Sequence, residues 1–225
     1  MYYIIKKNIV YIVFALSIII FTTSVLYKTL TFYAQNKVED LSKGMIRFHV
    51  VANSDTVEDQ LLKQKVKDRV IDYMQPILKD SKSVEETRQK IRQNLNQMQA
   101  IAKETIEGSN KSYGVYCSLG EASFPTKAYG DVVFPAGTYE AFRIIIGEGK
   151  GENWWCVMFP PLCYVDAATG VVPLEGKQEL EEHLNKEQLS VISGLNSNDY
   201  QIRFKIVDTI NEKNRINREK EKQFP

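Results

Sequence analysis

The chain has no excess of charge of either sign and few residues that could bind a metal ion. Its 225 residues include 29 Lys and Arg against 28 Asp and Glu, so no net positive charge draws it to nucleic acid. It has only two histidines, His49 and His183, and lacks the C-x-x-C and H-E-x-x-H spacings of zinc sites. We therefore expect no nucleic-acid partner, no metal, no cofactor and no small-molecule substrate.

Cysteine is also scarce, with Cys117, Cys156 and Cys163 as the only three. A thiol nucleophile needs a nearby base, and although His49 could serve Cys156 in space, nothing in the sequence sets that geometry. A turn at the two prolines between Cys156 and Cys163 could bring this pair within disulfide reach. The alternative, that all three are small buried residues, stays open. We expect no catalytic residue and no enzyme.

Charged side chains are missing from one long N-terminal stretch, residues 8–27. A helix of twenty residues spans about 30 Å, the thickness of the hydrocarbon core of a bilayer. Lys6 and Lys7 precede the stretch and only Lys28 follows it closely. Under the positive-inside rule the N-terminus then stays in the cytoplasm and the rest of the chain crosses the membrane.

We expect residues 1–30 to be an export signal or a membrane anchor that crosses the membrane through residues 9–27. Phe32-Tyr33-Ala34 supplies only one small residue for a signal cleavage site. An uncleaved anchor is therefore favoured, and cleavage stays open as the alternative. A buried core helix is the other reading of such a stretch, although core helices rarely stay uncharged for so long.

Two amphipathic helices are predicted in the first half of the exported part. Asp55, followed by Glu58 three residues later, resembles a helix-capping arrangement. Ser83 with Glu86 forms a second capping box, and the apolar stripe that follows it continues to Gly108. Because the link between the two helices is short, we expect them to lie antiparallel as a helical hairpin.

Strands are predicted from alternating and aromatic-rich segments. Residues 45–52 alternate apolar and polar side chains, and residues 113–119, 139–146 and 154–159 are rich in branched and aromatic side chains. The glycine-rich stretch 147–152 lies between the last two strands. It is followed by a strand and not by a helix that could hold a phosphate, so we predict that it closes a β-hairpin.

The segregation of strands and helices predicts an α+β fold, with an antiparallel or mixed sheet and a helical hairpin after the N-terminal transmembrane or signal helix. A further helix is expected over 178–192 and a strand over 200–207. We predict one exported domain over residues 45–208, a linker over 31–44, and a polar tail over 209–225.

Four aromatic residues crowd one short segment: Trp154, Trp155, Phe159 and Tyr164. Alternation along a strand sends Trp154 and Trp155 to opposite faces of the sheet. Either both faces are covered, or one tryptophan is displayed as an anchor for a partner, a role in which tryptophan is enriched.

Several segments closely resemble the stage II sporulation protein R family of endospore-forming Firmicutes. They are IRFHVVANSD (46–55), FPTK and YG (within 124–130), FPAGTY (134–139) and residues 147–163, within which NWWCVMFPPLC (153–163) is the most specific. The resemblance runs from about residue 45 to 166. It implies a protein made in the forespore and exported into the space between the two membranes around it. There such proteins trigger a membrane-embedded aspartic protease of the mother cell, which cleaves the precursor of sigma-E.

Position within these motifs is the basis for our candidate site. The residues predicted to form the partner-binding surface or its immediate support are His49, Asn53, Asp55, Trp154, Trp155 and Phe159. An exported cell-wall hydrolase and a membrane-anchored scaffold remain as alternative functions.

Overall fold

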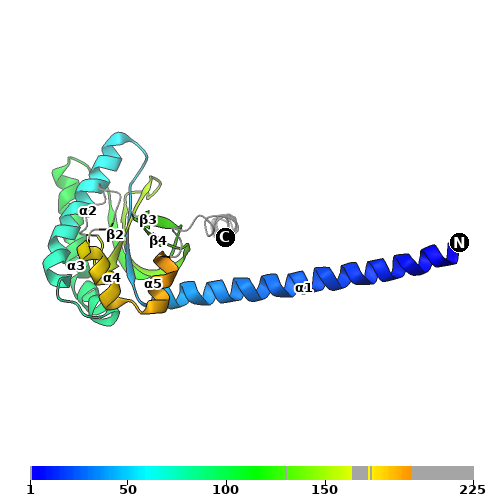
Figure 1. Cartoon of the computed structure of the whole chain (residues 1–225). Helices are drawn as coiled ribbons and strands as arrows, with labels where there is room; N and C mark the ends of the chain where they lie inside the picture. The colour runs from blue at the N-terminus through cyan, green and yellow to red at the C-terminus, as the bar shows by residue number, and fades with distance from the viewer. Residues whose placement is uncertain (1, 130, 164–171, 173, 194–225) are drawn as a thin grey trace. The chain divides into compact units, whose positions relative to one another are not determined.

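The computed structural model describes residues 2–129, 131–163, 172 and 174–193. It divides into two compact units, Met1–Val38 and Glu39–Pro225. Helix α1, Tyr2–Lys43, supplies the first unit and continues into the second (Figure 1). Within α1, Tyr11–Lys43 is long and apolar enough to cross a membrane. This is compatible with a signal or membrane segment. The predicted linker range 31–44 is helical up to Lys43.

The second unit is built on a mixed four-stranded sheet with the order β2-β5-β1-β6. Its strands are β1 (Ile46–Val51), β2 (Val115–Phe124), β5 (Gly137–Ile146) and β6 (Asn153–Phe159). Strand β1 is parallel to β5 and antiparallel to β6, and β2 is antiparallel to β5. Two short strands that the sequence did not predict, β3 (Lys127–Tyr129) and β4 (Val132–Phe134), form a separate antiparallel pair. The α+β class with a mixed sheet is confirmed.

The prediction that 147–152 closes a β-hairpin is wrong. The chain reverses there, but β1 lies between β5 and β6 and pairs with both. The glycine-rich stretch therefore crosses over the end of β1, where the Lys150 and Gly151 amides donate to the Asn53 and Ala52 carbonyls at 3.1 and 3.0 Å. Pairing with β1 buries a strand that is apolar along most of its length, which a simple hairpin would leave at an edge.

Helices α2 (Val57–Leu78) and α3 (Val84–Gly108) form the predicted helical hairpin and pack together on one face of the sheet (Figure 1). Ser83 caps α3 as predicted, because its Oγ accepts from the Glu86 amide at 3.2 Å. The cap predicted for α2 is wrong by one residue. Thr56, not Asp55, accepts from the Asp59 amide, since the Asp55 carboxylate is engaged by another loop.

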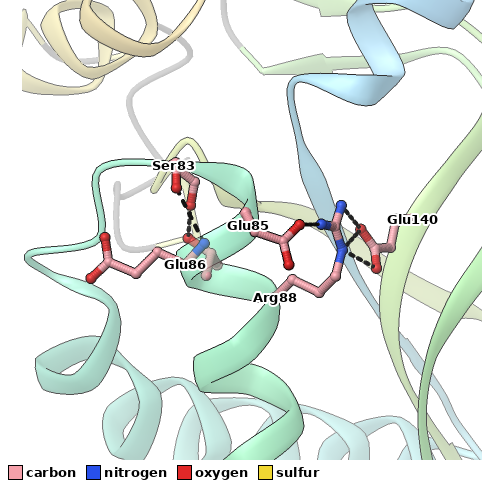
Figure 2. A network of polar contacts seen from close by, with 6 residues as sticks. Ser83, Glu85, Glu86, Arg88 and Glu140 are labelled. Atoms are coloured by element: carbon pink, nitrogen blue, oxygen red, sulfur yellow. Dashed lines mark hydrogen bonds and ion pairs between the residues drawn. The ribbon is translucent and has the colours of Figure 1, made fainter.

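An ion pair joins α3 to the sheet. The Nε of Arg88 lies 2.9 Å from both carboxylate oxygens of Glu140 on β5, and Arg88 also pairs with Glu85 on its own helix (Figure 2). The register places Glu121 of β2 directly opposite Glu140. Arg88 therefore offsets the repulsion between two carboxylates in neighbouring strands and fixes how the first turn of α3 sits on β5.

Helices α4 (Leu174–His183) and α5 (Lys186–Ser193) contribute to a second apolar cluster, with β4 and the other face of the sheet. The single helix predicted over 178–192 is therefore two. Asn185 breaks it, because its Oδ1 accepts from the Gln188 amide while Gln188 Oε1 accepts from the Asn185 amide, a reciprocal cap. The predicted strand 200–207 and the tail 209–225 lie outside the described residues.

Candidate partner-binding surface

A fully buried arginine organises the second face of the sheet. Arg47 on β1 has no exposed surface, and its guanidinium carbon lies over four aromatic rings. The distances to the ring centroids are 4.5 Å for Phe124, 5.1 Å for Tyr139, 5.2 Å for Phe134 and 6.0 Å for Tyr129. The electron-rich ring faces stabilise the cation. We call these five residues the Arg47 cage.

Hydrogen bonds tie the cage to β6. The Nε of Arg47 donates to the Cys156 carbonyl and one terminal nitrogen donates to the Tyr129 hydroxyl, both at 3.2 Å. Tyr129 in turn donates to the Trp155 carbonyl at 3.1 Å. Burial raises the pKa of Tyr129 and of Tyr139, so neither phenol supplies a compensating negative charge. Arg47 forms no ion pair with any described residue, and its NH1 is buried without a hydrogen-bond partner.

Next to the cage, His49 stacks on Trp155. The two rings lie 3.7 Å apart at 16° to one another, and the edge of Phe124 contacts both. The Nε2 of His49 lies 2.6 Å from Asn153 Oδ1. Because this oxygen only accepts, Nε2 carries the proton, and Nδ1 is left as a buried acceptor without a partner. Burial, aided by nearby Arg143, lowers the pKa of His49 to about 4 despite the Asn153 contact.

This shift predicts a pH dependence of stability. An unfolded histidine has a pKa of about 6.5, so His49 in the unfolded chain is largely protonated below that pH. In the folded chain His49 becomes protonated only near pH 4. The contribution of His49 to the free energy of unfolding should therefore fall as the pH drops through this window. Chemical unfolding at pH 7 and pH 4.5 should show a smaller pH effect in His49→Gln than in the wild type. Equal pH effects in the two proteins would contradict the assignment.

His49 and Trp155 belong to a row of paired residues across the sheet that also includes Arg143 and Ser118. The register aligns Ser118 of β2 with Arg143 of β5, Arg143 with His49 of β1, and His49 with Trp155 of β6. Arg143 Nε and Ser118 Oγ are both buried without a hydrogen-bond partner. Unpaired buried polar atoms are uncommon in folded proteins, and here three of them, with His49 Nδ1, lie in one row.

Asn53 and Asp55 hold two loops together. Asn53 Oδ1 accepts from the Glu148 amide at 3.0 Å, and Asp55 Oδ1 accepts from the Glu152 amide at 2.6 Å. The Asn53 side-chain amide also donates to Asp59 at 2.8 Å. These bonds fasten the loop after β1 onto the glycine-rich loop before β6. Both predicted residues thus support the end of the sheet from which Asn153 and Trp155 project.

Asp59 closes this network from the first turn of α2. It is buried and accepts from Ser54 Oγ at 2.6 Å as well as from Asn53. Burial alone would raise the pKa of its carboxyl, but the hydrogen bonds from Ser54 and Asn53 bring that pKa below its ordinary value. The carboxylate stays ionised at neutral pH and accepts from both loop residues.

The remaining predicted residues lie on the helix-covered side of the sheet. Trp154 is half-buried against the edge of Phe48, with the Lys67 ammonium 4.8 Å from its ring. Phe159 is buried, and its ring centroid lies 4.8 Å from that of His183. Both sheet faces are covered in part, and each tryptophan contacts a different core. The six predicted residues therefore do not share one surface: His49 and Trp155 do, and Asn53 and Asp55 support it.

Cys156 and Cys163 form a disulfide in the structure, with Cα atoms 5.4 Å apart. Cys117 is a buried free thiol on the helix-covered face, and burial raises its pKa to about 12. Its thiolate is therefore not populated at neutral pH, and the sheet separates it from His49. In the part of the chain that the structure describes, no group of three or more His, Cys, Asp or Glu could hold a metal ion.

Sequence reasoning missed Arg47, Asn153, Arg143 and Ser118. A signal existed for both arginines, because each is a charged residue between two apolar neighbours in its strand, and alternation sends it to the face opposite those neighbours. The strands that meet at this face could not be ordered from the sequence.

Comparison with known proteins assigns the chain to a family. The family model for stage II sporulation protein R matches residues 42–169. Stage II sporulation protein R of Bacillus subtilis (strain 168) is 41% identical over 159 residues, which cover 71% of this chain and 70% of that relative. No solved structure gives a significant match. The matched region contains the Arg47 cage, the stacked His49 and Trp155, and both docked loops. The chain belongs to the stage II sporulation protein R family and has a role in sporulation signalling.

Proposed function

We propose that the protein is exported from the forespore into the intermembrane space, where it activates a membrane-embedded aspartic protease of the mother cell. The protease then processes the sigma-E precursor. The observation that carries the proposal is the family match over residues 42–169, in a chain whose N-terminal helix is apolar enough to cross a membrane. The role is that of a ligand for a receptor, with no bond cleaved by this chain.

The N-terminal helix supports the expected direction of export. Lys6 and Lys7 precede the apolar stretch and Lys28 follows it, which favours a cytoplasmic N-terminus. The folded unit then lies on the far side of the membrane. The disulfide between Cys156 and Cys163 suits this location, because disulfides persist outside the reducing cytoplasm.

Activation by binding requires that the chain hold the active state of the protease more tightly than its idle state. Shifting an equilibrium from 1:99 to 99:1 takes about a 10⁴-fold preference. The face that carries His49 and Trp155 offers a tryptophan, a residue type enriched at binding hot spots, on a sheet whose loops are fixed by Asn53 and Asp55.

The test is reconstitution in a non-sporulating bacterium that expresses the full chain, the candidate protease and the sigma-E precursor. We expect precursor cleavage, followed by immunoblot, only when all three are present. A matched variant, Ile19→Arg with Ile20→Arg, places two charges in the apolar stretch at about 2.5–3.5 kcal/mol each and should retain the chain in the cytoplasm. Cleavage that persists without the chain, or with this retained variant, would refute the proposal.

The same material tests the alternative of a cell-wall hydrolase. Full chain purified in detergent is incubated with peptidoglycan, and soluble fragments are measured by chromatography. We expect none above a no-protein control. Fragment release, together with precursor cleavage that does not need the chain, would favour the hydrolase.

A further inference from the structure

Arg143 carries a charge that the described part of the chain leaves uncompensated. It is half-buried on β5, its Nε is enclosed without a hydrogen-bond partner, and it forms no ion pair with a described residue. Two other half-buried cations do have partners: Arg88 pairs with Glu140, and Lys177 pairs with Asp131. A guanidinium has five donors in a planar fork that fits a carboxylate.

The neighbours of Arg143 offer it no carboxylate. The pairing register places Ser118 and His49 directly beside it on the same face. Along its own strand the same-face neighbours are Ala141 and Ile145, because side chains alternate along a strand. The diagonal neighbours are Tyr116 and Gly120 on β2 and Arg47 and Val51 on β1. Arg47 is a second cation, so the local field is positive.

The residues around Arg143 have the chemistry of a protein interface. Tyr116 is 60% exposed, Asn153 is exposed, and His49 and Trp155 form a rigid stack. Tyrosine, tryptophan and arginine are the types most enriched at binding hot spots. We define the Arg143 face as Tyr116, Ser118, Arg143, His49, Asn153 and Trp155.

We propose that the Arg143 face binds an acidic segment of the partner protein, with Arg143 as the anchor for an Asp or Glu carboxylate. This rests on the proposed function and names the chemistry of the partner. The guanidinium donates to the carboxylate, Tyr116 and Trp155 contact the adjoining residues, and the bound segment compensates the charge that the fold leaves unpaired. A lipid surface fits less well, because anionic membranes are recognised by clusters of exposed cations, whereas Arg143 is half-buried and the neighbouring Arg47 is fully buried.

The test uses the three-component cleavage assay with full-length variants. Arg143→Glu should lower the initial rate of precursor cleavage at least tenfold, and Arg143→Gln should lower it less, since it removes the charge without creating repulsion. Arg92→Glu is the matched control. It makes the same charge change on an exposed residue of α3, on the far side of the sheet, and should cleave as the wild type does. Thermal unfolding of each purified variant checks that the fold is kept.

A second arm identifies the occupant. Each Asp and Glu on the outer face of the protease is changed to Lys, and we expect one such change to restore cleavage with Arg143→Glu. Wild-type rates in folded Arg143→Glu would overturn the inference while leaving the proposed function intact. The inference would also be overturned if no protease change restored cleavage with Arg143→Glu. It would likewise be overturned if the wild type self-associated and Arg143→Glu abolished that association, because the face would then bind a second copy of this chain. If the wild type itself fails to support cleavage, the proposed function is refuted.

Discussion

Replacing Arg47 by alanine is expected to lower the free energy of unfolding by about 3–5 kcal/mol, the range for emptying a large, fully buried site. The substitution leaves a cavity among four rings and removes their cation. It also deprives the Cys156 carbonyl and the Tyr129 hydroxyl of a donor, and buried polar groups without partners are costly. Chemical unfolding of the full chain in detergent, followed by circular dichroism, measures the effect.

Arg47→Met separates packing from charge. Methionine fills much of the same volume and is apolar, and buried charges can often be replaced by apolar residues at little cost. We therefore expect Arg47→Met to destabilise by about 1 kcal/mol, well below alanine. Equal losses for the two variants would mean that the cation itself, held by the rings, carries most of the stability of the cage.

The segments that carry the family resemblance meet in space, although they are far apart in the sequence. The motifs at 46–55, 124–130 and 134–139 supply Arg47 and all four of its rings. The sequence identified these segments but not what they build, because the cage depends on strands brought together by non-local pairing. Local patterns had no information about which strand would lie beside β1.

Features that depend only on neighbouring residues could be predicted, because local patterns do carry the information that sets them. The Ser83 cap and the two long helices follow from spacings of three and four residues. The Asp55 cap was misplaced because a distant amide, that of Glu152, competes for its carboxylate. Asn53 and Asp55 were chosen for a binding role, and their position at a loop junction gives them a structural one that no local pattern could reveal.

A methyl group added where the loop after β1 meets the glycine-rich loop should lower the free energy of unfolding. A Cβ added to Gly151 would meet the backbone carbonyl of Ser54 inside contact distance and lie 2.9 Å from the Cβ of Ala52. The Ser54 backbone cannot move aside as the far end of a flexible side chain can, and neither can the Cβ of Ala52, which is fixed to its own backbone. The Gly151 amide bond to the Ala52 carbonyl, 3.0 Å long, fixes the close approach. Gly151→Ala is therefore expected to cost about 2–3 kcal/mol by overpacking.

Gly120→Ala is the matched control, because nothing lies within 4 Å of the added Cβ and alanine in a strand restricts the unfolded chain more than glycine does. It should be neutral or slightly stabilising in the same unfolding measurement. Gly151→Ala should also slow precursor cleavage, since the loop that Gly151 closes holds Asn153 and hence the His49 ring in place. A Gly151→Ala protein as stable as Gly120→Ala would show that the two loops can separate without cost, and the support assigned to Asn53 and Asp55 would then have to be abandoned.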